Sequence, residues 1–154
     1  MKKQAFRTIT MVSLLLMLAA VSVNAQRLSD DSIAVNIPFD FAFGQTKLPA
    51  GNYTLRRLAL PSSYDRLVIQ NADGRGDSYT GISSPHRTSE TQKQSKLVFN
   101  RYGDQYFLSQ VWIAGSDTGR DLFQMRNERS LAKESKLAKT KPEQQKVTLT
   151  ASKQ

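Results

Sequence analysis

The sequence contains no cysteine, a single histidine and no apolar run of the length of a membrane-spanning helix. The absence of cysteine excludes disulfides, Cys-ligated zinc and thiol catalysis, so burial of apolar side chains has to stabilise the fold. The one histidine, His86, stands beside Arg87 in a polar stretch with only Glu90 nearby, which is typical of a solvated side chain. We therefore predict no catalytic residue, no metal site and no cofactor.

The longest apolar run, Met11–Val21, follows three basic residues near the start of the chain. It spans about a dozen residues, whereas a membrane-spanning helix needs ~20. Small residues precede the bond between Ala25 and Gln26. This pattern predicts a signal peptide over residues 1–25, cleavage between Ala25 and Gln26, and export to the periplasm or the medium with no integral membrane segment remaining. The alternative is an uncleaved N-terminal anchor helix.

Positive charge is concentrated at the C-terminal end. After Ala25 the chain has 19 Lys and Arg against 13 Asp and Glu, and 8 of these basic residues but only 3 of the acidic ones follow Met125. Such a tail is either simply solvated or attracted to an anionic polymer such as lipopolysaccharide or acidic polysaccharide. Nucleic acid is not expected, because the tail has no aromatic residue for base stacking. The lysines expected to contact an anionic polymer are Lys133, Lys136, Lys139 and Lys141.

Alternating apolar residues indicate β-strands in the first half of the exported part. Every second residue from Ile33 to Phe41 is apolar, which is the period of a half-buried strand. Pro38 has no backbone N–H, so this strand is expected at a sheet edge or with a bulge. Further strands are predicted over residues 53–60, 65–71 and 77–82, and exposed loops over residues 83–95 and 115–121.

The segment "NRYGDQYFLSQVW", from Asn100 to Trp112, looks like a functional motif, but it is also typical of a hairpin. Its Gly103-Asp104 pair lies between two apolar stretches, as in a two-residue type II′ loop. That register places Arg101 opposite Tyr106, where the guanidinium can lie against the ring.

Uninterrupted alternation in this hairpin also puts Trp112 on the same face as Tyr106, and Val111 on the other face. We therefore predict a candidate binding surface made of Arg101, Tyr106 and Trp112. The same register places Phe99 opposite Leu108.

The C-terminal region reads as a helix followed by a strand. Leu122–Lys139 has the composition of a helix with a thin apolar stripe, which either docks on the sheet or projects as an arm. Lys146–Ala151 reads as a last short strand. The whole pattern predicts an all-β fold, an antiparallel sandwich or flattened barrel of about seven strands with one short C-terminal helix. The expected organisation is a signal peptide (1–25), a β core (26–125) and a basic helical segment with a final strand (126–154).

Three stretches occur in a recognisable order and spacing: "NIPFDFAFGQTKLPAGNYTL" (Asn36–Leu55), the hairpin region Lys96–Leu122, and "ERSLAK" (Glu128–Lys133). In these stretches the chain resembles a group of small exported bacterial β-rich proteins of uncharacterised function. The resemblance implies an exported β-rich domain. It supplies no reaction, ligand or catalytic residue.

Three function classes remain open from the sequence. The favoured one is an exported, non-catalytic domain with a binding or envelope-structural role, whose partner is an envelope protein or glycan. The second is a polyanion-associated surface protein that uses the basic tail. The third is a small hydrolase, which requires His86 to pack beside two carboxylates or a serine in a pocket.

Overall fold

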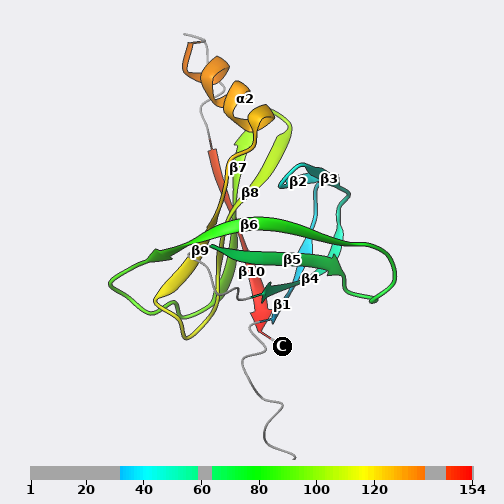
Figure 1. The fold of residues 1–154 in the computed structure, drawn as a ribbon, viewed down its shortest axis with the longest axis vertical. Helices are drawn as coiled ribbons and strands as arrows, with labels where there is room; N and C mark the ends of the chain where they lie inside the picture. The colour runs from blue at the N-terminus through cyan, green and yellow to red at the C-terminus, as the bar shows by residue number, and fades with distance from the viewer. Residues whose placement is uncertain (1–31, 59–63, 138–144, 154) are drawn as a thin grey trace, which may run out of the picture. The chain divides into compact units, whose positions relative to one another are not determined.

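The computed structural model describes residues 32–58, 64–137 and 145–153, and these residues form a β-rich domain with one helix (Figure 1). The elements in chain order are β1 (Ser32–Ile37), β2 (Phe41–Phe43), β3 (Thr46–Leu48), β4 (Gly51–Leu58), β5 (Asp65–Asn71), β6 (Ser78–Arg87), β7 (Ser95–Tyr102), β8 (Gln105–Trp112), β9 (Thr118–Leu122), α2 (Arg126–Leu137) and β10 (Gln145–Lys153).

Eight of these strands form a closed antiparallel barrel. Their order is β8-β7-β10-β1-β4-β5-β6-β9, and β9 pairs back onto β8 through Gln110 with Asp121 and Val111 with Arg120. Outside this ring, β2 and β3 form a hairpin. The hairpin extends the sheet because β2 pairs, in parallel, with the first residues of β8. The predicted all-β fold is confirmed and the flattened barrel fits it, whereas a sandwich and about seven strands describe it less well.

The barrel interior is filled by the alternating apolar residues of its strands. In β1, Ile33, Val35 and Ile37 are at most 5% exposed, as the period-two pattern predicts. The strand ends at Ile37, just before Pro38, and it lies between β10 and β4. The expectation of an edge or bulged strand is therefore wrong, because the missing N–H of Pro38 ends the ladder instead of interrupting it.

The hairpin of β7 and β8 has the predicted register at its tip. Arg101 pairs with Tyr106 and Phe99 with Leu108. Gly103 has a φ of 60°, which a two-residue primed turn requires at its first position and which glycine adopts without a Cβ penalty.

Further from the tip, the register shifts by one residue between Val98 and Phe99. Val98 pairs with Gln110, and the extra residue, Ser109, donates a hydrogen bond from its hydroxyl to the carbonyl oxygen of Val98 at 2.9 Å. A bulge inverts the alternation beyond it. The predicted faces of Trp112 and Val111 are therefore wrong: Val111 packs in the core.

Two segments predicted as exposed loops contain strands. β6 continues to Arg87, and Thr118–Leu122 forms β9; these two strands pair with each other from Ser83 to Arg87. Their residues are largely polar, so no apolar alternation reveals them. Each of the two segments satisfies its backbone hydrogen bonds by pairing with the other. The need to satisfy these bonds outweighs the weak strand propensity of the local sequence.

The C-terminal region is joined closely to the barrel. The side chain of Asn100 on β7 donates a hydrogen bond to the carboxylate of Glu128 on α2 at 2.8 Å, so the helix docks at one end of the barrel (Figure 1). β10 lies between β7 and β1, and the ring is not closed without it.

None of the helical residues that the structure describes forms a segment both long and apolar enough to span a bilayer.

Candidate functional site

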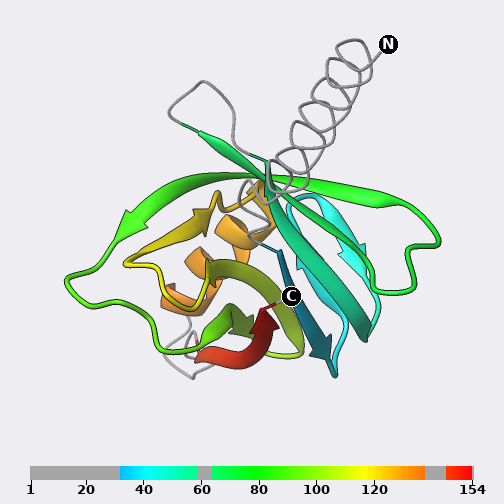
Figure 2. The same cartoon turned by 90° about the horizontal axis from the view of Figure 1, so that it is seen from below.

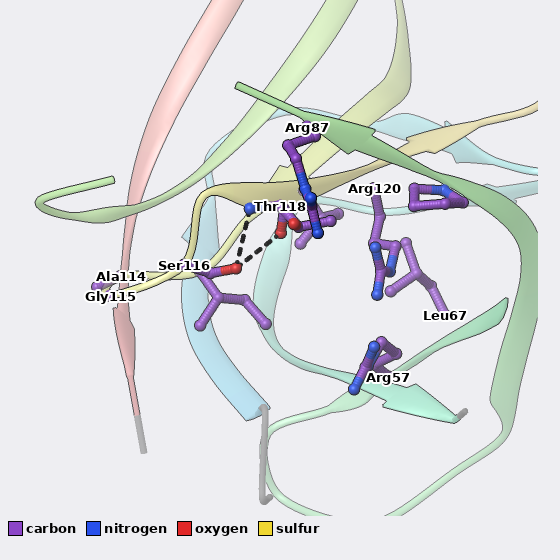
Figure 3. A pocket seen from close by; sticks show the side chains of 11 residues that line it. Arg57, Leu67, Arg87, Ala114, Gly115, Ser116, Thr118 and Arg120 are labelled. Atoms are coloured by element: carbon purple, nitrogen blue, oxygen red, sulfur yellow. Dashed lines mark hydrogen bonds between the residues drawn. The ribbon is translucent and has the colours of Figure 1, made fainter. Parts of the chain in front are cut away.

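A pocket of about 420 Å³ opens at the end of the barrel where β8 leads into β9 (Figure 3). Three arginines line it, each from a different strand: Arg57 from β4, Arg87 from β6 and Arg120 from β9. The apolar part of its wall comes from Leu67, Val111 and Ile113. Figure 2 views the same strands from below.

Cross-strand pairing explains why two of these arginines share the barrel interior with apolar side chains. Residues that face each other across a ladder project to the same side of the sheet. Arg57 pairs with the buried Leu67, and Arg120 pairs with the buried Val111. Both guanidiniums are therefore directed into the barrel by the register of their strands.

A single carboxylate connects the two inner arginines. The Oδ2 atom of Asp65 lies 3.0 Å from Nε of Arg120 and 3.5 Å from an Nη atom of Arg57. The side chains of Asp65 and Arg120 are 14% and 13% exposed, and that of Arg57 is 27% exposed. In this partly desolvated setting the shared carboxylate holds both guanidiniums on the pocket wall.

The third arginine, Arg87, stands at the rim with 79% of its side chain exposed. Its Nε atom lies 3.7 Å from a carboxylate oxygen of Asp117, which is itself half exposed. Such a pair in water is weak, so the guanidinium of Arg87 is available to an incoming anion.

The turn that borders the pocket is held by hydrogen bonds. The hydroxyl of Ser116 donates to the carbonyl of Thr118 and accepts from its N–H, each at 3.0 Å (Figure 3). The carbonyl of Gln92 accepts from the N–H of Gly115, and the N–H of Gln92 donates to the carbonyl of Ser116, each at 2.9 Å. The rim of the pocket is thus preformed.

His86 lies outside this pocket, in a network that crosses the closing strands. Its Nδ1 atom lies 2.8 Å from Asp121, whose other carboxylate oxygen accepts a hydrogen bond from the side-chain amide of Gln110 at 2.9 Å. Gln110 accepts a hydrogen bond from the indole N–H of Trp112 at 3.3 Å. His86 therefore contacts Asp121 instead of Glu90, and the pocket lies apart from the histidine that the hydrolase hypothesis requires.

Two of the three residues of the predicted binding surface are brought together. The guanidinium of Arg101 lies over the ring of Tyr106 at 5.3 Å from its centroid, and Phe39 stacks on that ring at 3.9 Å. Trp112 is only 5% exposed and lies at the other end of β8, beside Lys96 and His86. The structure thus separates Trp112 from Arg101 and Tyr106.

Sequence reasoning missed the pocket arginines, although one of them carries a signal. In β4 the buried positions are Tyr53 and Leu55, and Arg57 follows in the same phase. A charged residue at an inward position of a strand indicates a partner or a ligand inside the fold. No comparable signal marks Arg120, because its strand has no apolar alternation.

The sequence matches no protein-family model and no curated protein, and the structure matches no solved structure. The resemblance to a group of small exported proteins therefore stays a prediction, as do the export of the chain and its cleavage. The predicted signal peptide over residues 1–25, its cleavage site at Ala25 and Gln26, and the lysines Lys139 and Lys141 lie outside the described residues.

Proposed function

We propose that the protein is an exported, non-catalytic binding protein whose barrel mouth takes up a small anionic ligand. The observation that carries this proposal is the convergence of Arg57, Arg87 and Arg120 on one pocket. Guanidinium groups present a planar set of donors that matches a carboxylate or a phosphate, and they stay charged at any relevant pH.

The dimensions and lining of the pocket indicate the ligand class. A volume of about 420 Å³ is within the range of small-molecule sites, and closed eight-stranded barrels commonly hold one small ligand. Leu67, Val111 and Ile113 offer apolar contact beside the arginines. The ligand we propose is therefore a small carboxylate or phosphate ester with a short apolar body.

The charge arrangement favours entry in a defined order. Arg87 at the rim is well exposed and meets the anion first. Arg57 and Arg120 lie deeper and are already oriented by Asp65, so little conformational freedom is lost when the anion binds. This preorganisation on strands is what a binding site requires.

The proposal is tested by calorimetric titration of the purified protein with hexanoate and hexyl phosphate, and with hexanol as the uncharged control. We expect the anions to bind and hexanol to bind far more weakly. Arg87→Gln should weaken binding by about tenfold to a hundredfold, since a charge-assisted hydrogen bond contributes on the order of 1.5–3 kcal/mol. Arg101→Gln, on β7 near the tip of the hairpin and outside the pocket lining, is the matched control and should bind as the unaltered protein does.

Two results would overturn this function. If neither anion binds, or if Arg57→Gln and Arg87→Gln bind as tightly as the control, the pocket is not an anion site. If hexyl phosphate is recovered as hexanol and free phosphate after incubation with the protein, the protein is a hydrolase instead of a binding protein.

A further inference from the structure

A second concentration of positive charge lies on α2, away from the pocket. Four exposed basic residues follow one another at spacings of three, four and three positions: Arg126, Arg129, Lys133 and Lys136. At 3.6 residues per turn these positions fall within an arc of about 80°. We call this row of four side chains the basic stripe.

The basic stripe is turned away from the side of the helix that docks. Glu128, the buried residue of α2, is held by the side-chain amide of Asn100 at 2.8 Å. In a helix Glu128 is rotated by about 120° from the middle of the basic stripe. The helix lies at one end of the barrel (Figure 1), and the four residues of the stripe are exposed there.

Little negative charge offsets the basic stripe. Within the described parts of the chain, no carboxylate forms an ion pair with any of its four residues. Arg129 donates a hydrogen bond to the carbonyl oxygen of Gln124 at 3.0 Å, which leaves its charge uncompensated. The exposed acid of the helix, Glu134, is about 100° round from Lys133.

We infer that the basic stripe docks the protein on a bilayer that contains anionic phospholipid. Charge complementarity is the first argument, since Lys and Arg close to such a surface are each attracted by its negative potential. Leu137 supplies the second: its side chain is 82% exposed and lies beside the arc of the stripe. A lipid interface accommodates that apolar side chain, whereas a soluble polyanion offers it no partner.

The test compares the binding of the full chain to vesicles with and without phosphatidylglycerol, the latter made of phosphatidylcholine alone. The N-terminal residues are the same in every variant, so differences between variants report the changed residues. The stripe variant combines Arg126→Gln, Arg129→Gln, Lys133→Gln and Lys136→Gln. The control variant loses the same charge at exposed positions elsewhere and combines Lys47→Gln, Arg66→Gln, Arg75→Gln and Lys93→Gln.

We expect the stripe variant to lose affinity for phosphatidylglycerol vesicles by about a hundredfold or more at low salt, since each of the four cations contributes about fivefold. The control variant should lose much less, because its cations lie outside the stripe. Raised salt should reduce the binding of the unaltered protein in the same direction. Circular dichroism and thermal unfolding of both variants establish that the barrel is intact.

Three outcomes would overturn the inference. Equal losses in the two variants would mean that binding follows net charge alone, and unchanged binding of the stripe variant would mean that the stripe is not involved. Stripe-dependent binding to heparin without binding to vesicles would identify a soluble polyanion as the partner. Leu137→Ser provides a further check, because it should weaken vesicle binding and leave any heparin binding unchanged.

Discussion

Trp112 lies so close to the backbone of Gly119 that a Cβ atom on Gly119 would stand 2.6 Å from the indole ring. Gly119 precedes Arg120, which forms one of the two cross-strand pairs that close the barrel. The absent side chain thus makes room for the indole beside the closing strands, where Trp112 is 5% exposed.

Gly119→Ala should therefore destabilise the protein by about 1–3 kcal/mol, because an aromatic ring packed against strands cannot move aside without strain. Urea unfolding measures the change in free energy. Gly51→Ala is the control, since a Cβ there would meet the Tyr53 ring at an ordinary 3.5 Å. Equal effects of the two substitutions would contradict the close contact.

Gly103 provides the opposite case, with open space but a constrained backbone. No atom lies within 4 Å of a Cβ built on Gly103, whereas its φ is 60°. Gly103→Ala should cost about 1–2 kcal/mol through left-handed strain alone, and Gly103→Asn should cost less. Unfolding of the two variants side by side checks this ranking, and an Ala variant as stable as the unaltered protein would refute it.

Asp65 holds two arginines together, so its loss should affect stability and ligand binding in opposite directions. Asp65→Asn removes the negative charge that Arg57 and Arg120 both contact, and we expect a loss of about 1–3 kcal/mol of unfolding free energy. Anion affinity of the pocket should rise, because the competing carboxylate is gone.

The measurements are urea unfolding and titration with hexyl phosphate. Asp104→Asn is the control, because Asp104 is fully exposed and 3.9 Å from Arg101; it should change neither quantity. Weaker anion binding by Asp65→Asn would show that the carboxylate contributes to the site instead of competing for it.

Glu128 should make the stability of the protein depend on pH. Burial raises the pKa of its carboxyl above the ordinary value of 4.5, although hydrogen bonds from Asn100 and Gln124 act in the opposite direction. A raised pKa means that the folded state binds the proton more tightly than the unfolded state. The contribution of Glu128 to stability is therefore fully present below pH 4.5 and is lost as pH rises through the raised pKa.

Glu128→Gln should remove this pH dependence, because the amide is neutral throughout and its oxygen still accepts from Asn100. We expect the variant to gain stability relative to the unaltered protein as pH rises from 4 to 7. Unfolding free energies across this range test the prediction, with the exposed Glu134→Gln as control. If the unfolding free energies of Glu128→Gln and of the unaltered protein change with pH in parallel, burial does not raise the pKa of the Glu128 carboxyl.

Local patterns in the sequence were sufficient for several elements. Alternation identified β1, and the Gly103-Asp104 pair identified the hairpin with its register at the tip. Helical composition identified α2, although it did not place its limits. In each case the information lies within a few neighbouring residues, because period, turn chemistry and helix propensity are local properties.

The candidate site was less accessible to sequence reasoning. Arg57 shares the phase of the inward residues of β4, so its position was predictable in principle. Arg87 on β6 and Arg120 on β9 lie in polar segments. Nothing in the local sequence of either segment indicates that β6 and β9 pair with each other. Their convergence with Arg57 depends on strands that are distant in the sequence.

The sequence by itself determined the β-rich class, the absence of disulfides and the tip of the hairpin. Tertiary structure alone decided the bulge at Ser109, the closure of β8 on β9 and the pocket that this closure forms. The physical reason is that a bulge and a barrel closure are selected by the packing and hydrogen bonding of the whole sheet. One added residue exchanges the faces of Val111 and Trp112, so that Val111 packs in the core, without any change in the local apolar pattern.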